Sequence, residues 1–457
     1  MLKRKKKQIK MAELVRRMKK LEQQVARCSR CGICQSVCPL YNVTQNESDV
    51  ARGKLMLIDG LMRSFFDDPE GVWQRLDRCL LCGSCAANCP RHVNGVEIFL
   101  NARVVIAGYR RMPLVKKIIF RNILLNPDFF DRVMSFTAKW QGLFFRKTNF
   151  KLNASCAAMV SLPFSDRKML PLAPVPFHKI SQGLLSELKA SPEPALEKSN
   201  KTNGINVAFF VGCLLDKVFP KVAADILRIL HFHGVQVILP PSQGCCGIPA
   251  LASGDDRTFN RLVTDNLNHF NPSDYDYLVT GCATCTATIK TIWPALFTDT
   301  SDNQKTAVHR VAEKTYDINQ FLVNVLKIQL PLMATENESK PVVTWHDPCH
   351  LKKTLGVYAE PRQLICANDA YSFVEMPAAD ACCGMGGSFN LAHYTLSADI
   401  GKKKVVSIEK TGAAVVATGC PACMIQLADM LAATGKKIRV AHSAELYSEK
   451  ILPPDIL

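Results

Sequence analysis

The sequence predicts a multidomain protein in which an α-helical, cysteine-rich N-terminal domain precedes two duplicated α/β domains. Ten of the 20 cysteines in the 457 residues form two copies of one five-thiol pattern. Eight more form two matched four-thiol sets near the N-terminus. After residue 206, short apolar segments alternate with helical ones, which is typical of parallel α/β units. These observations predict a protein built around soft-metal groups.

The upstream sets share the spacing Cys-x2-Cys-x2-Cys-x3-Cys-Pro, and about 40 residues separate them. Their members are Cys28, Cys31, Cys34 and Cys38 in the first set, and Cys79, Cys82, Cys85 and Cys89 in the second. Closely spaced thiolates on short loops are what iron–sulfur clusters require. Within the gap, Val50 to Met62 has the pattern of a helix. A long helical gap resembles the α-helical ferredoxin domain of respiratory iron–sulfur proteins.

In this motif the fourth cysteine usually binds the other cluster. We therefore expect two [4Fe-4S] clusters whose ligands cross between the sets. The expected ligands are Cys28, Cys31, Cys34 and Cys89 for one cluster, and Cys79, Cys82, Cys85 and Cys38 for the other. Structural zinc is disfavoured, because these thiols lie in a tighter run than zinc sites use.

The five-thiol sets follow predicted strands. They are Cys213, Cys245, Cys246, Cys282 and Cys285 in the first copy, and Cys349, Cys382, Cys383, Cys420 and Cys423 in the second. The intervening lengths are 31 and 35 residues in one copy and 32 and 36 in the other. The expected strands are Val207–Val211, Val235–Leu239 and Tyr277–Thr280, then Val342–Trp345, a strand near Phe373, and Ala414–Ala417. Open α/β sheets build ligand sites at strand ends, so each copy is a candidate metal site of a duplicated domain.

Four segments are expected along the chain. Residues 1–105 form the helical ferredoxin domain, and residues 106–205 form a basic helical region with a Pro-rich linker at Pro171–Pro176. Residues 206–335 and 336–457 form the two α/β domains. The basic region has apolar residues at helical spacing, and we expect its helices either to pack on neighbouring domains or to form a docking surface.

Cysteine usage and sequence patterning indicate a cytoplasmic location. A disulfide framework belongs to short secreted domains, and the basic N-terminus has no apolar run of a signal peptide behind it. No apolar run reaches the roughly 18 residues of a membrane-spanning helix. The two remaining cysteines, Cys156 and Cys366, are expected to be buried apolar thiols.

The net charge of +17 is concentrated in two segments. Residues 3–20 and 103–151 each carry +9, so the rest of the chain is nearly neutral. Because this charge lies outside the cysteine-rich units, it favours an acidic partner protein or peripheral contact with the inner membrane face over nucleic acid.

The pattern Cys…Cys-Cys-Gly…Cys-x2-Cys resembles the CCG domain of heterodisulfide reductases. Joined to a ferredoxin domain, it is similar to the iron–sulfur subunits of glycolate oxidase, D-lactate dehydrogenase and anaerobic glycerol-3-phosphate dehydrogenase. The resemblance implies that each five-cysteine set holds a noncubane [4Fe-4S] cluster, with a plain cubane or zinc as alternatives. His350, next to Cys349, is a candidate hydrogen-bond donor to a cluster sulfur.

Two functions follow as hypotheses. The chain lacks the glycine motifs of flavin, nicotinamide and phosphate sites. The resemblance then implies an electron-transfer subunit of a flavin-dependent 2-hydroxyacid dehydrogenase, working with a flavoprotein and passing electrons to a quinone, a cytochrome-type membrane partner or another carrier. The alternative is a heterodisulfide reductase-like catalytic protein that cleaves or forms a disulfide at a noncubane cluster. A non-redox scaffold or nucleic-acid binder with structural metal is a third, weaker hypothesis.

Overall fold

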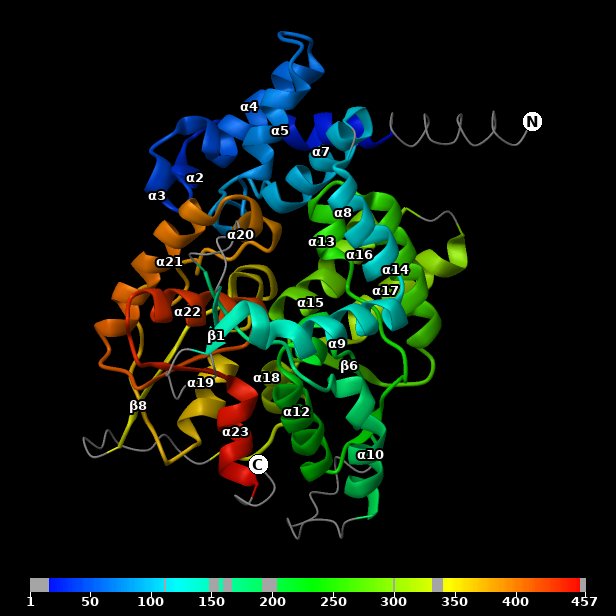
Figure 1. Cartoon of the computed structure of the whole chain (residues 1–457). Coiled ribbons are helices and arrows are strands. Elements are labelled where there is room, and N and C mark those ends of the chain that lie inside the picture. Colours follow the sequence, from blue (N-terminus) through cyan, green and yellow to red (C-terminus); the bar gives the residue numbers. More distant parts are fainter. Residues whose placement is uncertain are drawn as a thin grey trace.

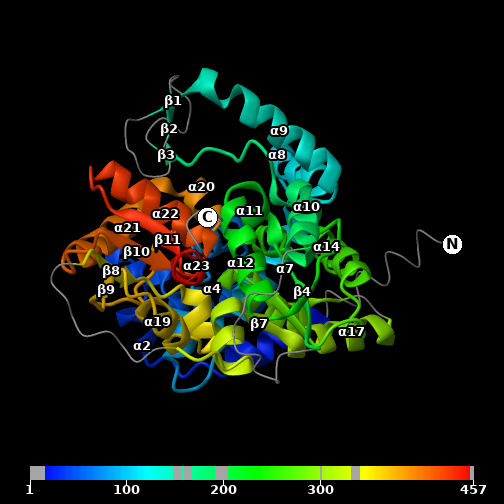
Figure 2. The ribbon, with the colours of Figure 1, turned by 90° about the horizontal axis from the view of Figure 1, so that it is seen from below.

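The computed structural model describes residues 16–110, 112–147, 156–158, 167–190, 204–298, 301–330 and 340–452. The N-terminal helical domain lies across one end of two α/β units that stand beside one another (Figure 1). Seen from below, the first unit in green and the second in orange and red lie side by side, with α8 and α9 along one edge (Figure 2). Each α/β unit carries one five-cysteine set.

The described part of the N-terminal domain, residues 16–110, is helical and contains no strand. Residues 16–26 are helical and lead directly to Cys28. The expected helix between the two four-cysteine sets is present as α4. The elements are α2 (Ile33–Ser36), α3 (Tyr41–Thr44), η1 (Glu47–Asp49), α4 (Ala51–Met62), α5 (Pro69–Asp77), α6 (Ser84–Ala87) and α7 (Gly95–Tyr109).

The first α/β unit has a four-stranded, all-parallel sheet in the order β5-β4-β6-β7. Its strands are β4 (Asn206–Phe209), β5 (Gln236–Ile238), β6 (Tyr277–Thr280) and β7 (Thr315–Asp317). The helices are α11 (Gly212–Lys217), α12 (Pro220–Phe232), α13 (Ile248–Ala252), α14 (Asp256–His269), α15 (Ala283–Ala287), η3 (Thr288–Ile292), α16 (Trp293–Leu296), α17 (Asp302–Lys314), α18 (Ile318–Gln320) and η4 (Phe321–Val325). The first three strands match the sequence-based prediction, and β7 is an addition.

The second unit repeats this topology with the parallel order β9-β8-β10-β11. Its strands are β8 (Val342–Trp345), β9 (Ser372–Phe373), β10 (Val415–Thr418) and β11 (Arg439–His442). The helices are η5 (His350–Thr354), α19 (Ala359–Cys366), α20 (Ser388–Ala392), α21 (Tyr394–Glu409), α22 (Pro421–Ala433) and α23 (Ser443–Ile451). The matching strand order supports the duplication that the cysteine spacing predicts.

The segment between the domains holds both helices and strands. It contains α8 (Leu114–Ile118), the π-helix η2 (Ile119–Leu124), α9 (Pro127–Phe144) and α10 (Phe177–Ala190). Three short strands, β1 (Phe145–Lys147), β2 (Cys156–Ala158) and β3 (Lys168–Met169), form an antiparallel sheet that the sequence did not predict. The apolar residues Leu114, Val115 and Ile118 are exposed, whereas Phe120 is buried and Leu124 packs against the core, so this segment combines packing with an exposed apolar face.

Arg103 joins the helical domain to the first α/β unit. This α7 side chain is buried, and its guanidinium donates hydrogen bonds to the carbonyls of Cys79 at 2.8 Å and Ala252 at 2.8 Å. Gly254 has a φ of +82°, and a Cβ there would lie 2.9 Å from the Arg103 carbonyl oxygen. The close approach of these two backbones fixes the helical domain against the first unit.

Candidate metal centres

The two four-cysteine sets line two adjacent pockets in the helical domain. The first pocket is lined by Cys28, Cys31, Cys34 and Cys89, together with Cys85. The second is lined by Cys79, Cys82, Cys85 and Cys38. Each fourth cysteine therefore lies in the pocket of the other set, which is the crossed grouping that the motif predicts. Cys85 lines both pockets, so the two sites adjoin.

Matched backbone turns present these thiols. Arg30 and Gly32 have φ values of +59° and +87° in the first loop, and Leu81 and Gly83 have +56° and +75° in the second. These residues occupy the same places in each Cys-x2-Cys segment. Left-handed residues at these places reverse the chain tightly. Both loops therefore wrap around their pocket with the same geometry.

Buried cations lie beside the second pocket. Lys54 is 1% exposed, and its ammonium donates a hydrogen bond to the Asp49 carbonyl. Burial lowers the pKa of Lys54, and the negative charge of Cys79 opposes that shift. Burial likewise raises the pKa of Cys38 to about 11, which keeps its proton on in the absence of a metal. A buried ammonium such as that of Lys54 needs a compensating negative charge. An iron–sulfur cluster with four thiolate ligands has net negative charge, so it suits this pocket.

The Cys-Cys-Gly turns require glycine in both α/β units. Gly247 and Gly384 have φ values of +91° and +95°. A Cβ would lie 2.8 Å from a Phe259 ring carbon at the first glycine and 2.5 Å from the Ser397 carbonyl oxygen at the second. Each glycine N–H points at the sulfur two residues earlier, at 3.5 Å and 3.4 Å respectively. An amide dipole aimed at sulfur favours negative charge there, whereas hydrogen bonds with the neighbouring cysteines raise the pKa of Cys245 and Cys382.

The sulfurs within each five-cysteine set lie at metal-ligand spacing. The Cys213 and Cys245 Sγ atoms are 3.9 Å apart, and those of Cys383 and Cys423 are 3.5 Å apart. A disulfide needs about 2.05 Å, whereas two thiolates on one tetrahedral metal at 2.3 Å lie ~3.8 Å apart. The described cysteines are free thiols. The donor sets therefore fit a soft metal group, although their ligation stays a prediction.

In each set the second cysteine of the Cys-Cys pair has a lowered pKa. Hydrogen bonds from Cys245 and Cys285 lower the pKa of Cys246. The equivalent Cys383 receives hydrogen bonds from Cys382 and Cys423, and its pKa is lowered in the same way. Soft-metal ligands must be deprotonated. Both sets are thus prepared for metal binding at the same position of the motif.

The four sites form one continuous series. A hydrogen bond from Cys382 of the second unit lowers the pKa of Cys82 in the helical domain to about 5. Cys420 of the second unit receives a hydrogen bond from Cys282 of the first, which lowers the pKa of Cys420. The order is therefore the two helical-domain pockets, the second unit and then the first. Sequence spacing gave no signal of this order, because the contacts join residues 138 and 300 positions apart.

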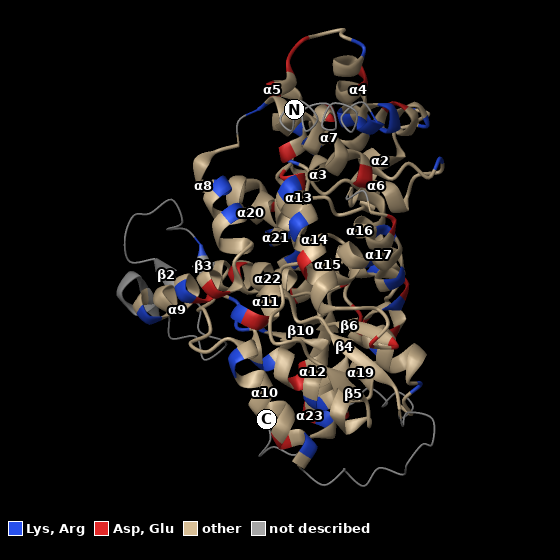
Figure 3. Ribbon diagram, turned by 90° about the vertical axis from the view of Figure 1, so that its right-hand side faces the viewer, with Lys and Arg blue, Asp and Glu red and all other residues tan. Residues whose placement is uncertain are grey.

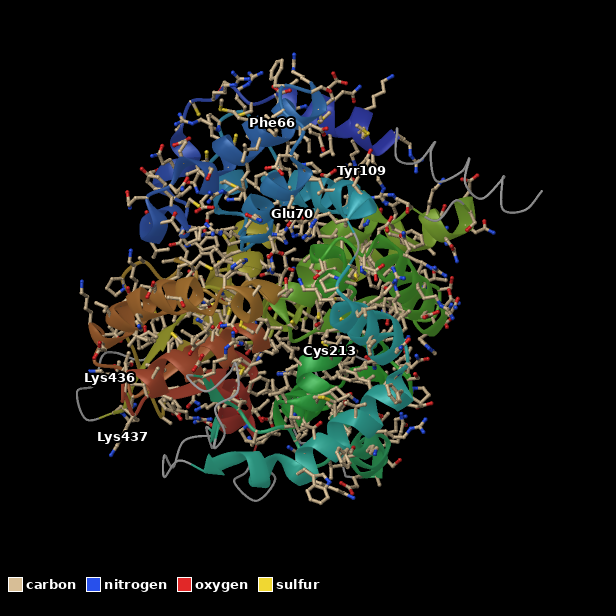
Figure 4. The ribbon with its side chains drawn as sticks, turned by 45° about the horizontal axis from the view of Figure 1, so that its top comes forward. Phe66, Glu70, Tyr109, Cys213, Lys436 and Lys437 are labelled. Carbon is tan, nitrogen blue, oxygen red and sulfur yellow. The ribbon has the colours of Figure 1, made fainter. Side chains whose placement is uncertain are left out.

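A pocket opens onto the first unit's sulfurs. Its lining includes Cys213 and Cys245 and extends to η2, α9 and α10. Cys213, labelled in Figure 4, lies on the green unit near the cyan helices. Three further lining residues, Asp131, His178 and Asp216, have ligand atoms within 4.8 Å of one another. The Lys217 ammonium donates to both carboxylates, so this cluster is an ion-pair network; sequence analysis missed it because its members come from three separate segments.

His350, the candidate donor to a cluster sulfur, has hydrogen-bond partners in two other domains. Its Nδ1 lies 3.1 Å from Thr284 Oγ1, and its Nε2 lies 3.2 Å from the Leu81 carbonyl oxygen. The Thr284 hydroxyl in turn lies 3.4 Å from Cys420 Sγ. His350 therefore joins the helical domain to the first unit, and Thr284 links it to the sulfur of Cys420.

The two cysteines outside the motifs have separate outcomes. Cys366 ends α19 and is half-buried rather than fully buried. Burial raises the pKa of its thiol, as expected for an unreactive apolar side chain. The Cys156 side chain lies outside the described residues.

Comparisons with known proteins agree with this arrangement. The cysteine-rich CCG domain matches residues 207–290 and 343–428, and the 4Fe-4S dicluster domain matches residues 24–93. A probable glycolate oxidase iron–sulfur subunit of Bacillus subtilis is 28% identical over 94% of each chain. A lactate utilization protein A of Oceanobacillus iheyensis is 31% identical over 53% of this chain and 97% of its own length. One component of a fumarate reductase (CoM/CoB) of Methanothermobacter marburgensis is 29% identical over 82% of this chain and 72% of its own.

The fold and the cysteine sites thus define an iron–sulfur protein with a dicluster domain and two CCG domains. More specifically, the chain belongs to the family that includes the glycolate oxidase iron–sulfur subunits and the lactate utilization proteins A. Members of this kind are iron–sulfur components of oxidoreductases, and this chain is such a component.

Proposed function

We propose that this chain is the electron-transfer subunit of a flavin-dependent 2-hydroxyacid dehydrogenase of the glycolate or D-lactate type. A separate flavoprotein oxidises the hydroxyacid to the 2-oxoacid and releases two electrons and two protons. This chain passes the electrons, one at a time, to a quinone or another carrier, and a quinone becomes a quinol by taking two electrons and two protons. The cofactors in this proposal are two [4Fe-4S] clusters in the helical domain and one metal group in each CCG unit, either a noncubane [4Fe-4S] cluster or zinc.

The observation that carries the proposal is the continuous series of sulfur sites. Cys85 lines both helical-domain pockets, Cys82 is hydrogen-bonded to Cys382, and Cys420 is hydrogen-bonded to Cys282. Iron–sulfur clusters accept and release single electrons at potentials set by their surroundings. A series of four adjoining sites across three domains suits passage of electrons better than binding of a single substrate.

The surrounding side chains hold these sites and compensate their charge. The helical-domain ligands would be Cys28, Cys31, Cys34 and Cys89 at one site, and Cys79, Cys82, Cys85 and Cys38 at the other. Lys54 and Arg103 lie buried beside the second of these sites, where positive charge favours the reduced, more negative state. In the CCG units nine of the ten motif cysteines are buried, all but Cys213, and burial excludes water from their thiols and protects them from side reactions.

Reconstitution tests this proposal. The chain, purified anaerobically, is mixed with its candidate flavoprotein, and dye and quinone reduction are followed with glycolate and D-lactate. We expect quinone reduction only when both proteins are present. Oxidation of a hydroxyacid by this chain alone would contradict the accessory role. Iron and sulfide analysis of the same sample should give iron–sulfur absorption, whereas a protein with zinc alone would overturn the cluster assignment and favour a structural-metal scaffold.

A second candidate function is disulfide chemistry at a CCG unit. The pocket beside Cys213 and Cys245 gives a small molecule access to sulfurs of the first unit, and a fumarate reductase (CoM/CoB) component is among the relatives. In this function a disulfide takes up two electrons from the helical-domain sites and two protons, and leaves as two thiols. Disulfide-dependent oxidation of the dithionite-reduced chain, with free thiol as product, would favour it; reduced chain that is stable to disulfides would exclude it.

A basic and apolar face is the proposed attachment surface. On α8, η2 and α9 it exposes Leu114, Val115, Ile118, Ile119, Phe129, Phe136 and Trp140. Lysines and arginines interleave with them, as the blue segments of α8 and α9 show (Figure 3). Among the described helices, none is both long and apolar enough to cross a membrane. We propose that this face binds an acidic flavoprotein surface or the anionic inner membrane face.

Salt extraction tests the attachment. Each basic side chain near an anionic leaflet contributes about 1 kcal/mol, and exposed charges are screened within roughly 8 Å at physiological ionic strength. High salt should therefore release the chain from membranes of its own cell. Release by detergent alone would show that apolar contact or an integral partner holds it, and would contradict the electrostatic account.

A further inference from the structure

His346 is a buried side chain beside the thiols of the second CCG unit. It follows β8 directly and is fully buried. Within the described part of the chain, neither of its ring nitrogens has a partner at normal hydrogen-bond distance, and its interaction with the Cys383 thiol helps to lower the pKa of that thiol. One ring nitrogen and the sulfurs of Cys383 and Cys423 lie within 4.8 Å of one another. The ring is therefore aimed into the second five-cysteine set.

An imidazole in this position needs a partner. A buried polar group without one costs about 1–3 kcal/mol, and most buried side-chain nitrogens in proteins are paired. Neutral imidazole is a ligand for zinc and for iron in iron–sulfur centres. A metal beside the two sulfurs would take the nitrogen lone pair and remove this cost.

The duplication supplies an internal comparison. Phe210 follows β4 directly, and its N–H donates to the Val279 carbonyl at 2.9 Å. The His346 N–H donates to the Ala417 carbonyl of the equivalent strand at 2.8 Å. Phe210 is also fully buried, and its ring packs on Phe270 with centroids 5.5 Å apart. The same backbone position thus carries an apolar ring in the first unit and a potential ligand in the second.

The two sets also differ in the positive charge beside them, and again the second set has the additional groups. The side chains of Lys353 and Lys404 lie near the second set, where the negative charges of Cys349 and Cys382 raise the pKa of Lys353. Lys404 is 2% exposed and donates to the Ala378 and Ala379 carbonyls. In the first unit, Lys217 stands four residues after Cys213, as Lys353 stands after Cys349, but it pairs with carboxylates instead.

We propose that His346 is a nitrogen ligand of the metal group at the second CCG site. This site then has a mixed thiolate and imidazole donor set, whereas the first has thiolates alone. The metal is an iron of a cluster or a zinc ion, both of which accept this donor set. The inference rests on the metal-binding role proposed for the CCG units, and it is independent of the partner and the direction of electron flow.

Metal analysis of the full chain, purified anaerobically, tests the proposal. The element that Cys383→Ser loses, relative to wild type, identifies the metal of the second site. His346→Phe, which installs the residue of the first unit, should lose most of that element and leave the remaining metal unchanged. His346→Cys, which restores a ligand, should retain it. Full retention of the element by His346→Phe would overturn the proposal, as would a Cys383→Ser variant that loses no metal.

Spectroscopy of the wild-type chain gives a second test that needs no variant to fold. With ¹⁵N-labelled histidine, pulsed electron paramagnetic resonance should detect a directly coordinated nitrogen if the second site holds paramagnetic iron. X-ray absorption at the zinc edge should detect one nitrogen among sulfurs if it holds zinc. A metal-loaded second site with sulfur ligands alone would overturn the proposal. Because neither measurement uses a flavoprotein, failure here is distinguishable from failure of the electron-transfer function.

Discussion

The two CCG units share one backbone plan and differ in what surrounds their thiols. Both have four parallel strands in the same order and a Cys-Cys-Gly turn with a left-handed glycine. The second unit adds His346, Lys353 and Lys404 around its sulfurs and contacts Cys82 of the helical domain. The first unit has an opening beside Cys213.

The comparison distinguishes the features that bring the thiols together from those that set their surroundings. Strand ends and the glycine turn place five thiols together, and both copies keep these features. Position in the molecule distinguishes the two sets of thiols, because the second set contacts both Cys82 of the helical domain and Cys282 of the first set. Buried charge then follows position, since a site enclosed by protein on both sides loses the water that would otherwise stabilise its charge.

The largest expected effect comes from breaking the series of sites. Cys382→Ser with Cys383→Ser, and separately Cys245→Ser with Cys246→Ser, should each remove the metal of one unit. If electrons pass through the units in series, both double variants should lower quinone reduction in the reconstituted complex to the rate without this chain. Substantial activity in one of them would show that the two units act as parallel branches. Metal analysis confirms that only the intended site is lost.

Replacing each turn glycine with alanine should destabilise the protein by a different amount in the two units. A left-handed non-glycine residue costs roughly 1–2 kcal/mol, and a forced steric contact adds about 1–3 kcal/mol. At Gly384 the obstacle is the Ser397 carbonyl oxygen, whereas at Gly247 it is a Phe259 ring that can move. Gly384→Ala should therefore lower the melting temperature more than Gly247→Ala. Calorimetry of the anaerobic proteins measures both, and equal shifts would contradict the assumed rigidity of the second turn.

The fourth strands of the two sheets end in groups that titrate in opposite senses. Asp317 pairs with Thr280 and His442 with Thr418 in equivalent registers. Burial raises the pKa of Asp317 from 3.8 to about 7, and burial lowers the pKa of His442 from 6.5 to about 4. Between pH 3.8 and about 7 the folded state keeps a proton on Asp317 that the unfolded state has lost. The contribution of Asp317 to stability therefore falls as the pH rises through this range. The His442 contribution instead rises with pH between 4 and 6.5.

Asp317→Asn should remove the first of these dependences. Between pH 5 and 7 the free energy of unfolding of the wild type should fall by about 2 kcal/mol, and that of the variant should not. The variant should still fold, because asparagine retains an oxygen acceptor for the Asn319 N–H. Melting temperature measured against pH checks this. His442→Asn serves as the opposite case and should flatten the rise between pH 4 and 6.5. A variant curve parallel to wild type would show that Asp317 is ionised in the folded protein.

The smallest expected effect is electrostatic tuning of the second site. Lys404→Met removes a buried cation near the thiols of Cys349 and Cys383. The reduction potential of this site should fall by on the order of 50 mV, because reduction adds negative charge that the ammonium stabilises. Lys402→Met, on the same helix with an exposed side chain, is the matched control. Redox titration followed by electron paramagnetic resonance measures both, and equal potentials in the two variants would exclude this role for Lys404.

Local regularities made much of the fold and site predictable. Thiol spacing gave the four sets, and apolar runs that end at Gly-Cys gave β4, β6 and β10 to within two residues. Of the two fourth strands, β7 was missed because Thr315–Asp317 directly follows α17 and has no turn residue before it. The sheet of β1, β2 and β3 was missed because its strands have only two or three residues.

The sequence by itself determined the thiol donor sets, the duplication and the crossing of Cys38 and Cys89 between pockets. Each of these depends on short segments whose backbone is set by spacing, glycine and proline. Only the tertiary structure decided that Cys82 meets Cys382, that Cys282 meets Cys420, and that His346 faces the second set while His350 bonds to Thr284 and Leu81. These outcomes depend on how three domains pack, and packing depends on surface complementarity between segments far apart in the chain.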